Sequence, residues 1–257
     1  MHADPALIRS MKAHVSPEEW AMRTDLAAAY RAVAMYGWDD LVFTHLSARV
    51  PGPEHHFLIN PYGMTFEEIT ASSLVKVDLQ GRKVMDSPFE INPAGFTIHS
   101  AVHEARADAI CVMHVHTIEG VAVSCQRGGL LPISQPSLFP LSSLAYHDYE
   151  GLALNPAEKV RLVGDLGDKT FLILRNHGLL VCAATVADTF LSLYVLQKAC
   201  EIQVRAQAGG GELIPVPQPI VDGIRAQREV VLRQSGGMIA WPGILRRLDW
   251  RDPSWRE

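Results

Sequence analysis

Short β-branched runs alternate along this chain with amphipathic helical segments, but they do not form a regular strand–helix–strand repeat. Early in the sequence, the strand-like residues 41–50 and 56–59 are joined by Pro51-Gly52-Pro53, a turn signal typical of a hairpin. The hairpin and the lack of a crossover repeat favour an α/β fold with a mainly antiparallel sheet. Further strands are predicted at residues 75–78, 83–85, 109–115, 169–175 and 179–182, and helices at residues 17–36, 95–105, 117–125, 186–208 and 222–234.

The composition excludes several classes of function. Of the 257 residues, 48% are hydrophobic and 20% are charged, which is enough apolar material for a large core. The net charge is −5 and no basic run occurs, so nucleic-acid binding is not expected. No stretch approaches the roughly 20 apolar residues of a membrane-spanning helix, and the N-terminus has no apolar signal segment. Four scattered cysteines without a Cys-x-x-Cys pair fit a reducing compartment. We therefore expect a cytoplasmic protein that binds a small-molecule substrate and no membrane.

Two histidines separated by one residue lie on a predicted strand. Alternation along the strand places His114 and His116 on the same face, about 6–7 Å apart at the backbone, so both imidazoles can reach one ion. A catalytic zinc takes three protein ligands and leaves a position open. His177 is the strongest candidate for the third ligand, because it interrupts an apolar strand, and a lone polar residue at such a point indicates a specific role. The plainer alternative is that these histidines only form hydrogen bonds or pack.

Several segments along the chain gain meaning when they are taken together and in order. They are Thr44-His45-Leu46-Ser47-Ala48-Arg49, Ile59-Asn60-Pro61-Tyr62-Gly63, Asn92-Pro93-Ala94-Gly95-Phe96, Arg106-Ala107-Asp108, His114-Val115-His116-Thr117, Tyr146-His147-Asp148-Tyr149-Glu150-Gly151 and Leu174-Arg175-Asn176-His177-Gly178. With these segments, the chain resembles the class II aldolase/adducin family from about Asp25 to about Ala208. The resemblance implies a three-layer α/β/α fold around a mainly antiparallel central sheet. It also implies a homotetramer, with a divalent metal near a subunit boundary held by three histidines at His114, His116 and His177.

The resemblance also divides the chain. Residues 1–20 are predicted to be an N-terminal extension, and residues 21–208 to form the class II aldolase/adducin-like domain. Residues 209–257 begin with three glycines and a series of prolines, which mark an exposed connection. We expect this connection and a following helix to pack on the same domain.

The sequence departs from the aldolase pattern at the substrate site. In the aldolases, a glutamate that is both metal ligand and acid/base stands where this chain has Gly95. The family's two phosphate-binding hydroxyl residues are replaced by Pro93 and Ala94, and a phosphate-binding asparagine by His45. These changes remove donors suited to a phosphate and argue against a sugar-phosphate substrate. The segment Asn92-Pro93-Ala94-Gly95-Phe96 resembles the adducin-head branch of the family, which in animals serves a cytoskeletal protein with no known catalysis.

The leading hypothesis is a metal-dependent lyase that cleaves a carbon–carbon bond of an oxygenated small molecule, by retro-aldol reaction or decarboxylation. Zn²⁺ is the expected ion, with Mn²⁺ or Fe²⁺ as alternatives. One competing hypothesis is an adducin-like, non-catalytic interaction protein that has kept the fold. Another is an iron-dependent oxygenase, because three imidazoles also suit iron.

With glycine at position 95, another group has to move the proton. His45 and His99 are candidates, since imidazole titrates near neutrality, although either histidine could simply pack or form hydrogen bonds. Tyr146, with Tyr149, could donate from a neighbouring subunit, or could pack in an interface.

Substrate contacts are predicted at three further positions. Asn60 and Gly63 belong to a loop that resembles the family, and Arg175 precedes the third histidine and could pair with a substrate carboxylate. A surface ion pair is the alternative for Arg175. Residues 55–56 and 147–148 are interpreted as solvated turn and loop residues.

Overall fold

A single sheet organises the computed structural model, which describes residues 4–152, 157–234 and 236–257. In this part of the chain the sheet has seven strands in the order β3-β2-β1-β4-β7-β6-β5. Neighbouring strands are antiparallel except β5 and β6, so the predicted mainly antiparallel sheet is confirmed. The strands are β1 (His45–Arg49), β2 (Phe57–Ile59), β3 (Val75–Val77), β4 (Cys111–Val115), β5 (Leu144–His147), β6 (Phe171–Leu174) and β7 (Gly178–Ala183).

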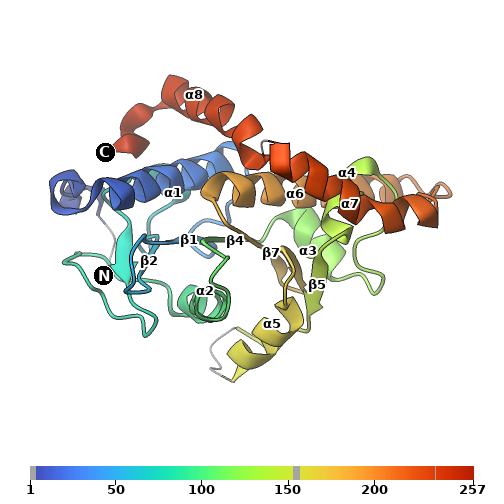
Figure 1. Cartoon of the computed structure of the whole chain (residues 1–257), viewed down its shortest axis with the longest axis horizontal. Helices are drawn as coiled ribbons and strands as arrows, with labels where there is room; N and C mark the ends of the chain where they lie inside the picture. The colour runs from blue at the N-terminus through green and yellow to red at the C-terminus, as the bar shows by residue number, and fades with distance from the viewer. Residues whose placement is uncertain (1–3, 153–156, 235) are drawn as a thin grey trace.

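Helices cover both faces of the sheet, which confirms the three-layer arrangement. In Figure 1, α1 and α6 lie on one side of the sheet, and α2 and α5 lie on the other. Each face has its own cluster of buried apolar side chains. The helices are α1 (Pro17–Met35), α2 (Pro93–Ala105), α3 (Ile118–Ser124), α4 (Gln135–Leu141), α5 (Glu158–Leu166), α6 (Val186–Ala208), α7 (Gln218–Gln234) and α8 (Trp241–Arg251).

Strand β4 shows how the alternation of side chains positions the polar site. Cys111, Met113 and Val115 belong to the apolar cluster under α1 and α6, whereas Val112 belongs to the cluster under α2 and α5. His114 therefore points to the α2 side of the sheet. On the neighbouring strand β1, His45 is paired with His114 and Ser47 with Val112, so these side chains also face α2.

The first helix begins where the sequence predicts. The Ser16 hydroxyl accepts a hydrogen bond from the Glu19 backbone N–H at 3.1 Å, and Pro17 occupies the first helical turn. The helix ends before Gly37, whose φ of 69° is in the left-handed region. The last residues of the predicted N-terminal extension thus belong to α1, and residues 1–3 of that extension lie outside the described residues.

Several local predictions were wrong. The predicted strand at residues 83–85 is reduced to an isolated bridge between Val77 and Lys83. The predicted last helix begins earlier, at Gln218, and α8 follows it. Helix α8 packs on α1, where Trp241 Nε1 donates to Asp25 Oδ1 at 3.2 Å. The elements α4, β5 and α5 were not predicted at all.

Within the described residues, no helix combines the length and the apolar character needed to cross a bilayer.

Candidate metal centre

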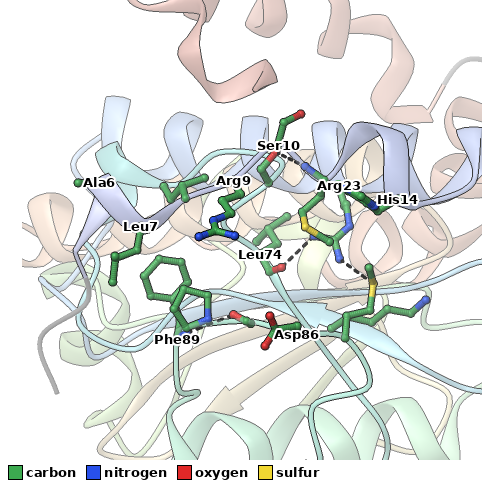
Figure 2. A pocket seen from close by; sticks show the side chains of 16 residues that line it. Ala6, Leu7, Arg9, Ser10, His14, Arg23, Leu74, Asp86 and Phe89 are labelled. Carbon is green, nitrogen blue, oxygen red and sulfur yellow. Dashed lines mark hydrogen bonds between the residues drawn. The ribbon is translucent and has the colours of Figure 1, made fainter.

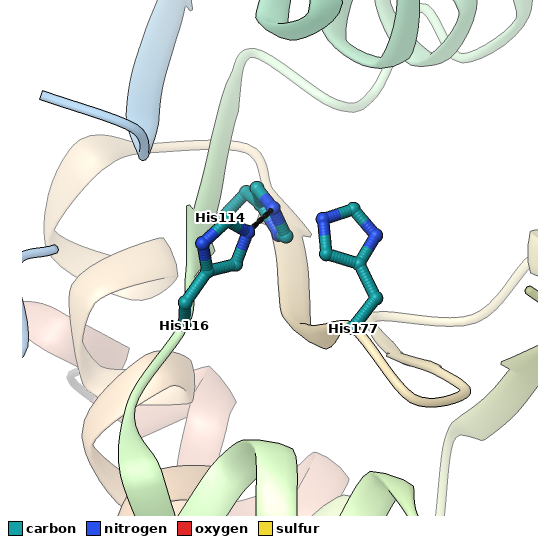
Figure 3. Close-up of side chains that lie close together, drawn as sticks. All are labelled: His114, His116 and His177. Carbon is teal, nitrogen blue, oxygen red and sulfur yellow. Dashed lines mark hydrogen bonds between the residues drawn. The ribbon is translucent and has the colours of Figure 1, made fainter. Parts of the chain in front are cut away.

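Three histidines converge at one edge of the sheet (Figure 3). His114 lies on β4, His116 directly follows that strand, and His177 lies in the short turn between β6 and β7. One ligand nitrogen from each of the three lies within 4.8 Å of the others. The trio predicted from the sequence therefore forms a group consistent with a divalent metal site.

The turn that carries His177 has an unusual backbone. Asn176 has a φ of 55°, a left-handed conformation that asparagine tolerates better than most residues. The next residue, Gly178, packs against β4, because a Cβ there would lie 2.5 Å from the Val115 carbonyl oxygen and 3.1 Å from His116 Cδ2. Glycine at this position thus lets the turn close against the strand that bears the other two histidines.

Hydrogen bonds fix which nitrogen of two histidines is free to bind an ion. His114 Nδ1 lies 2.9 Å from the Leu179 carbonyl oxygen, and His116 Nδ1 lies 3.0 Å from Asp40 Oδ2. Carbonyl and carboxylate oxygens only accept, so both Nδ1 atoms carry a proton, and in a ring with a single proton Nε2 carries a lone pair. These two Nε2 atoms lie 2.8 Å apart. Facing lone pairs repel, and a cation bound by both relieves the repulsion, so the residues fit a divalent ion.

Burial favours the neutral form of His114 and His177, the form that binds a metal. Removal from water, reinforced by the neighbouring histidines, lowers the pKa of His114 well below its usual value. The same two causes lower the pKa of His177 to about 4. Neutral imidazoles can bind a metal near neutral pH without first losing a proton.

Asp40 has the position of an orienting partner for a ligand. Its carboxylate accepts from His116 Nδ1, an arrangement that fixes the ring and makes Nε2 a better ligand. We expect Asp40→Asn to weaken divalent-metal affinity by about 10–100-fold without removing any ligand. Titration against a chromophoric chelator measures this, with Asp39→Asn as the neighbouring control. An unchanged affinity in Asp40→Asn would show that the carboxylate does not support the site.

The histidines line a cavity of about 640 Å³. Among the described residues that line it, none is a lysine or an arginine, and Asp40 is the charged side chain. Large apolar and aromatic side chains surround the cavity and remain exposed: Phe43, Tyr62, Tyr149 and Leu152. The described residues thus give the cavity imidazoles and an apolar rim, and they include no lysine or arginine to receive a phosphate.

His45 fills the space beside Gly95. A Cβ at Gly95 would lie 2.3 Å from His45 Cδ2 and 2.7 Å from His45 Nε2, far inside normal contact distance. His45 lines the cavity and is 3% exposed. A side chain at position 95 and the His45 ring therefore exclude each other in this conformation. The side chain of Ala94, another predicted departure, lies outside the described part of the chain.

His99 lies behind His45. Its Nε2 atom is 2.8 Å from His45 Nδ1, it is fully buried, and it does not line the cavity. Burial is the main cause that lowers the pKa of His45 to about 3 and the pKa of His99 well below its usual value. Of the two predicted proton-transfer histidines, His45 can therefore meet a ligand directly, and His99 can act only through it.

Tyr146 and Arg175 lie outside the cavity within this chain. Tyr146 is on β5, and its hydroxyl accepts from the Leu130 backbone N–H at 3.0 Å. The Arg175 guanidinium stacks 4.2 Å from the centre of the Tyr146 ring and donates to the Gln126 carbonyl oxygen at 2.8 Å. These contacts place both side chains beside α3 and the loop after it, so their predicted roles at a substrate remain predictions.

Asn60 and Gly63 also lie outside the lining of the cavity. Asn60 is 2% exposed and its Oδ1 accepts from the Tyr30 hydroxyl at 2.9 Å, which ties β2 to α1. Gly63 has a φ of 98° and completes a turn. Between them, Tyr62 does line the cavity, so the loop contributes to the site through a residue that was not among the predicted substrate contacts.

The interpretation of His147 as a solvated loop residue was wrong. It is 3% exposed, its Nδ1 donates to Asp165 Oδ2 at 2.7 Å, and Glu158 Oε1 lies 3.6 Å from its Nε2. Both acidic residues lie on α5, an element that the sequence did not reveal. His147 thus joins β5 to α5.

A second cavity, of about 620 Å³, lies apart from the histidines between the N-terminal segment and β3 (Figure 2). Arg23 lines it, but its guanidinium is bound to Glu19 and to the Leu74 carbonyl oxygen. None of the residues predicted for the site lines this cavity. The three predicted metal ligands and His45 line the other cavity.

Comparison with known proteins agrees with this geometry. A protein of Pseudomonas aeruginosa named "Putative aldolase class 2 protein" is 60% identical over 260 residues, covering 100% of this chain and 99% of the relative. Mouse alpha-adducin is 46% identical over 207 residues, which are 78% of this chain and 28% of the adducin.

Solved structures show the same fold. An aldolase II superfamily protein from Pseudomonas syringae superposes with a TM-score of 0.93 at 47% identity, covering 97% of this chain and 100% of the other. L-fuculose 1-phosphate aldolase from Glaciozyma antarctica PI12 superposes with a TM-score of 0.79 at 28% identity, covering 93% of each chain. The model of the Class II Aldolase and Adducin N-terminal domain matches residues 24–204. The chain therefore belongs to the class II aldolase and adducin N-terminal domain family.

Proposed function

We propose that the protein is a divalent-metal-dependent lyase that cleaves a carbon–carbon bond of a small, oxygenated and unphosphorylated substrate, by retro-aldol reaction or decarboxylation. The observation that carries the proposal is the pair of facing Nε2 atoms of His114 and His116, with His177 completing the group, in a cavity. An open three-histidine site suits a metal that also has to bind substrate. The name of the P. aeruginosa relative supports an aldolase-like activity.

The lining of the cavity supports the unphosphorylated substrate. Arginine and lysine are the side chains that neutralise a phosphate group, and the described lining residues include neither of them. Besides the histidines, the side-chain donors among these residues are the neutral amides of Asn92 and Asn176 and the hydroxyls of Tyr62 and Tyr149. Glycine leaves no acidic side chain at position 95, and His45 fills the adjacent space. This set of residues differs from one that selects a sugar phosphate, so we do not extend the substrate named for the G. antarctica enzyme to this chain.

The ion, His45 and the apolar rim of the cavity would have different roles in the reaction. When bound, the ion would supply a Lewis acid that stabilises the negative charge developing on substrate oxygens as the bond breaks. His45 faces the same cavity and is placed to hydrogen-bond the reacting substrate. The apolar rim around Phe43 and Tyr149 can exclude water from the reacting atoms. Zn²⁺ is the ion we propose, with Mn²⁺ or Fe²⁺ as alternatives.

A substrate screen tests the proposal. Zinc-, manganese- and iron-loaded protein should cleave at least one unphosphorylated hydroxy acid or hydroxy aldehyde, with turnover lost on treatment with a chelator and restored by metal. We expect cleavage of fuculose and ribulose phosphates to be at least about 100-fold slower, since the lining residues that the structure describes offer no lysine or arginine to the phosphate. Product release is measured by coupled dehydrogenase assays and by mass spectrometry. Efficient cleavage of a sugar phosphate would contradict the substrate class, and oxygen consumption with iron would favour an oxygenase.

An adducin-like interaction protein is the second candidate. It is favoured by the 46% identity to mouse alpha-adducin and by glycine at position 95. A scaffold has no chemical need for an open metal site, so it predicts no metal-dependent turnover across the screen. The cytoplasmic location and the homotetramer implied by the family resemblance are part of our proposal, and light scattering checks the assembly.

A further inference from the structure

A continuous chain of buried hydrogen bonds runs from the backbone to the cavity. His103 Nδ1 lies 3.1 Å from the Ala109 carbonyl oxygen, and His103 Nε2 lies 2.7 Å from the Ser47 hydroxyl. The same hydroxyl lies 2.5 Å from His99 Nδ1, and His99 Nε2 lies 2.8 Å from His45 Nδ1. The last ring borders the cavity, so four side chains in succession connect a carbonyl oxygen of the interior with the site.

The direction of every bond in this chain follows from its first member. A carbonyl oxygen can only accept, so His103 carries its proton on Nδ1 and accepts at Nε2. The Ser47 hydroxyl must then donate to His103, which leaves its oxygen to accept from His99 Nδ1–H. With its single proton on Nδ1, His99 accepts at Nε2 from His45 Nδ1–H. His45 is thereby left with an unprotonated Nε2.

The three rings lie where a neutral imidazole is favoured. His45, His99 and His103 are 3%, 0% and 1% exposed, and in this chain of bonds each has hydrogen-bond partners for a single proton. Burial is also the main cause that lowers the pKa of His103 to about 3 and the pKa of His99 well below its usual value. When each ring carries one proton, the Ala109 carbonyl oxygen determines the donor and the acceptor of every hydrogen bond in the chain.

We propose that this chain locks His45 in the Nδ1–H tautomer, so that the cavity meets its Nε2 as a hydrogen-bond acceptor, and that Ser47, His99 and His103 are positioning residues. The consequence for substrate choice rests on the proposed function. An acceptor beside the metal site selects a substrate that presents an O–H group there, and it disfavours one that presents only a carbonyl or carboxylate oxygen.

The fold explains why these residues meet. His45 and Ser47 alternate on β1 and therefore share the face toward α2, while His99 and His103 are four residues apart and share one side of that helix. Ser47 is the decisive link, because a hydroxyl accepts from one ring and donates to the next. A methyl group in its place would leave one nitrogen of each of two buried rings, His99 Nδ1 and His103 Nε2, without this partner.

Neutron diffraction from crystals of the full, deuterium-exchanged chain tests the proposal without a substrate. We expect deuterium on Nδ1 of His45, His99 and His103, and a Ser47 O–D bond directed at His103 Nε2. Deuterium on His45 Nε2, with none on Nδ1, would overturn the proposal. This outcome does not depend on turnover, so a correct tautomer without carbon–carbon cleavage would contradict the proposed function and leave the hydrogen-bond chain intact.

Substitution of Ser47 tests its role as the link. In Ser47→Ala, we expect deuterium at His45 to divide between Nδ1 and Nε2, because His99 loses the acceptor that fixed its proton. Any substrate found in the screen should lose kcat by about 10-fold with a smaller change in KM. Ser47→Thr should restore the single tautomer, and Ser124→Ala, which removes another buried hydroxyl, should leave it unchanged. An unaltered His45 tautomer in Ser47→Ala would overturn the assignment of Ser47, and if that variant does not fold, the wild-type neutron structure decides alone.

Discussion

Replacing His114, His116 or His177 with alanine should abolish stoichiometric metal binding, with affinity at least about 100-fold lower in each variant. Loss of a partner outside the ligands already costs about 10–100-fold, and loss of a ligand nitrogen removes one of three bonds to the ion. Elemental analysis of freshly purified protein, followed by chelator competition, measures both content and affinity. We expect about one divalent ion per chain in the wild type.

The fold should survive these substitutions, because the three histidines border a cavity and none of them belongs to a cluster of buried apolar side chains. Circular dichroism should therefore be unchanged in the variants. His14→Ala is the matched control, since His14 is exposed and lies outside the histidine cavity. Full metal content in His177→Ala would remove His177 from the site and leave His114 and His116 without a third ligand.

Gly95→Ala should be nearly as damaging to the site, although it adds a single methyl group. The new Cβ would lie 2.3–2.7 Å from three atoms of the His45 ring, so the ring has to leave its place and break its bond to His99. Overpacking costs about 1–3 kcal/mol, which exceeds the gain of about 1 kcal/mol from alanine in a helix. Turnover should fall by about 100-fold or more, as expected when a proton-transfer group is misplaced. Urea unfolding and kinetics measure the two effects.

Two further variants separate the clash from a general effect of alanine. Gly164→Ala lies in α5 with no atom within 4 Å of the added Cβ, so it should stabilise the protein slightly. In a His45→Ala background the ring is absent, and Gly95→Ala should then no longer destabilise. An equal loss of stability in both backgrounds would mean that His45 does not fill this space. Glutamate at position 95 meets the same obstacle, so restoring the family's acid should not by itself create sugar-phosphate cleavage.

The metal group could be predicted from the sequence because its geometry is local. The spacing of His114 and His116 on a strand fixes their common face, and the break that His177 makes in an apolar run marks a turn. The family resemblance led to the same three positions. In contrast, the partner of His116 could not be predicted, because Asp40 lies in an irregular segment 76 residues away that no periodic pattern describes.

The close packing of His45 against Gly95 could not be predicted from the sequence either. The two positions differ from the aldolase pattern separately, and only their placement on β1 and α2 shows that one compensates for the other. Helix α8 was missed for a different reason. Trp241, Ile244 and Leu248 have helical spacing, but four of the eleven residues from Trp241 to Arg251 are charged. These three apolar residues are recognised as a buried helix face only in the structure, where α8 packs on α1.

Anomalous diffraction from crystals grown with Zn²⁺ tests the central claim most directly. Data collected on both sides of the zinc absorption edge should give one strong peak per chain, at about 2.0–2.1 Å from the Nε2 atoms of His114 and His116 and from one ring nitrogen of His177. The electron density should also show a position on the ion that is open toward the cavity and His45. A crystal whose histidine cavity gives no anomalous peak, or whose zinc lies on other residues, would contradict the metal centre and the lyase proposed from it.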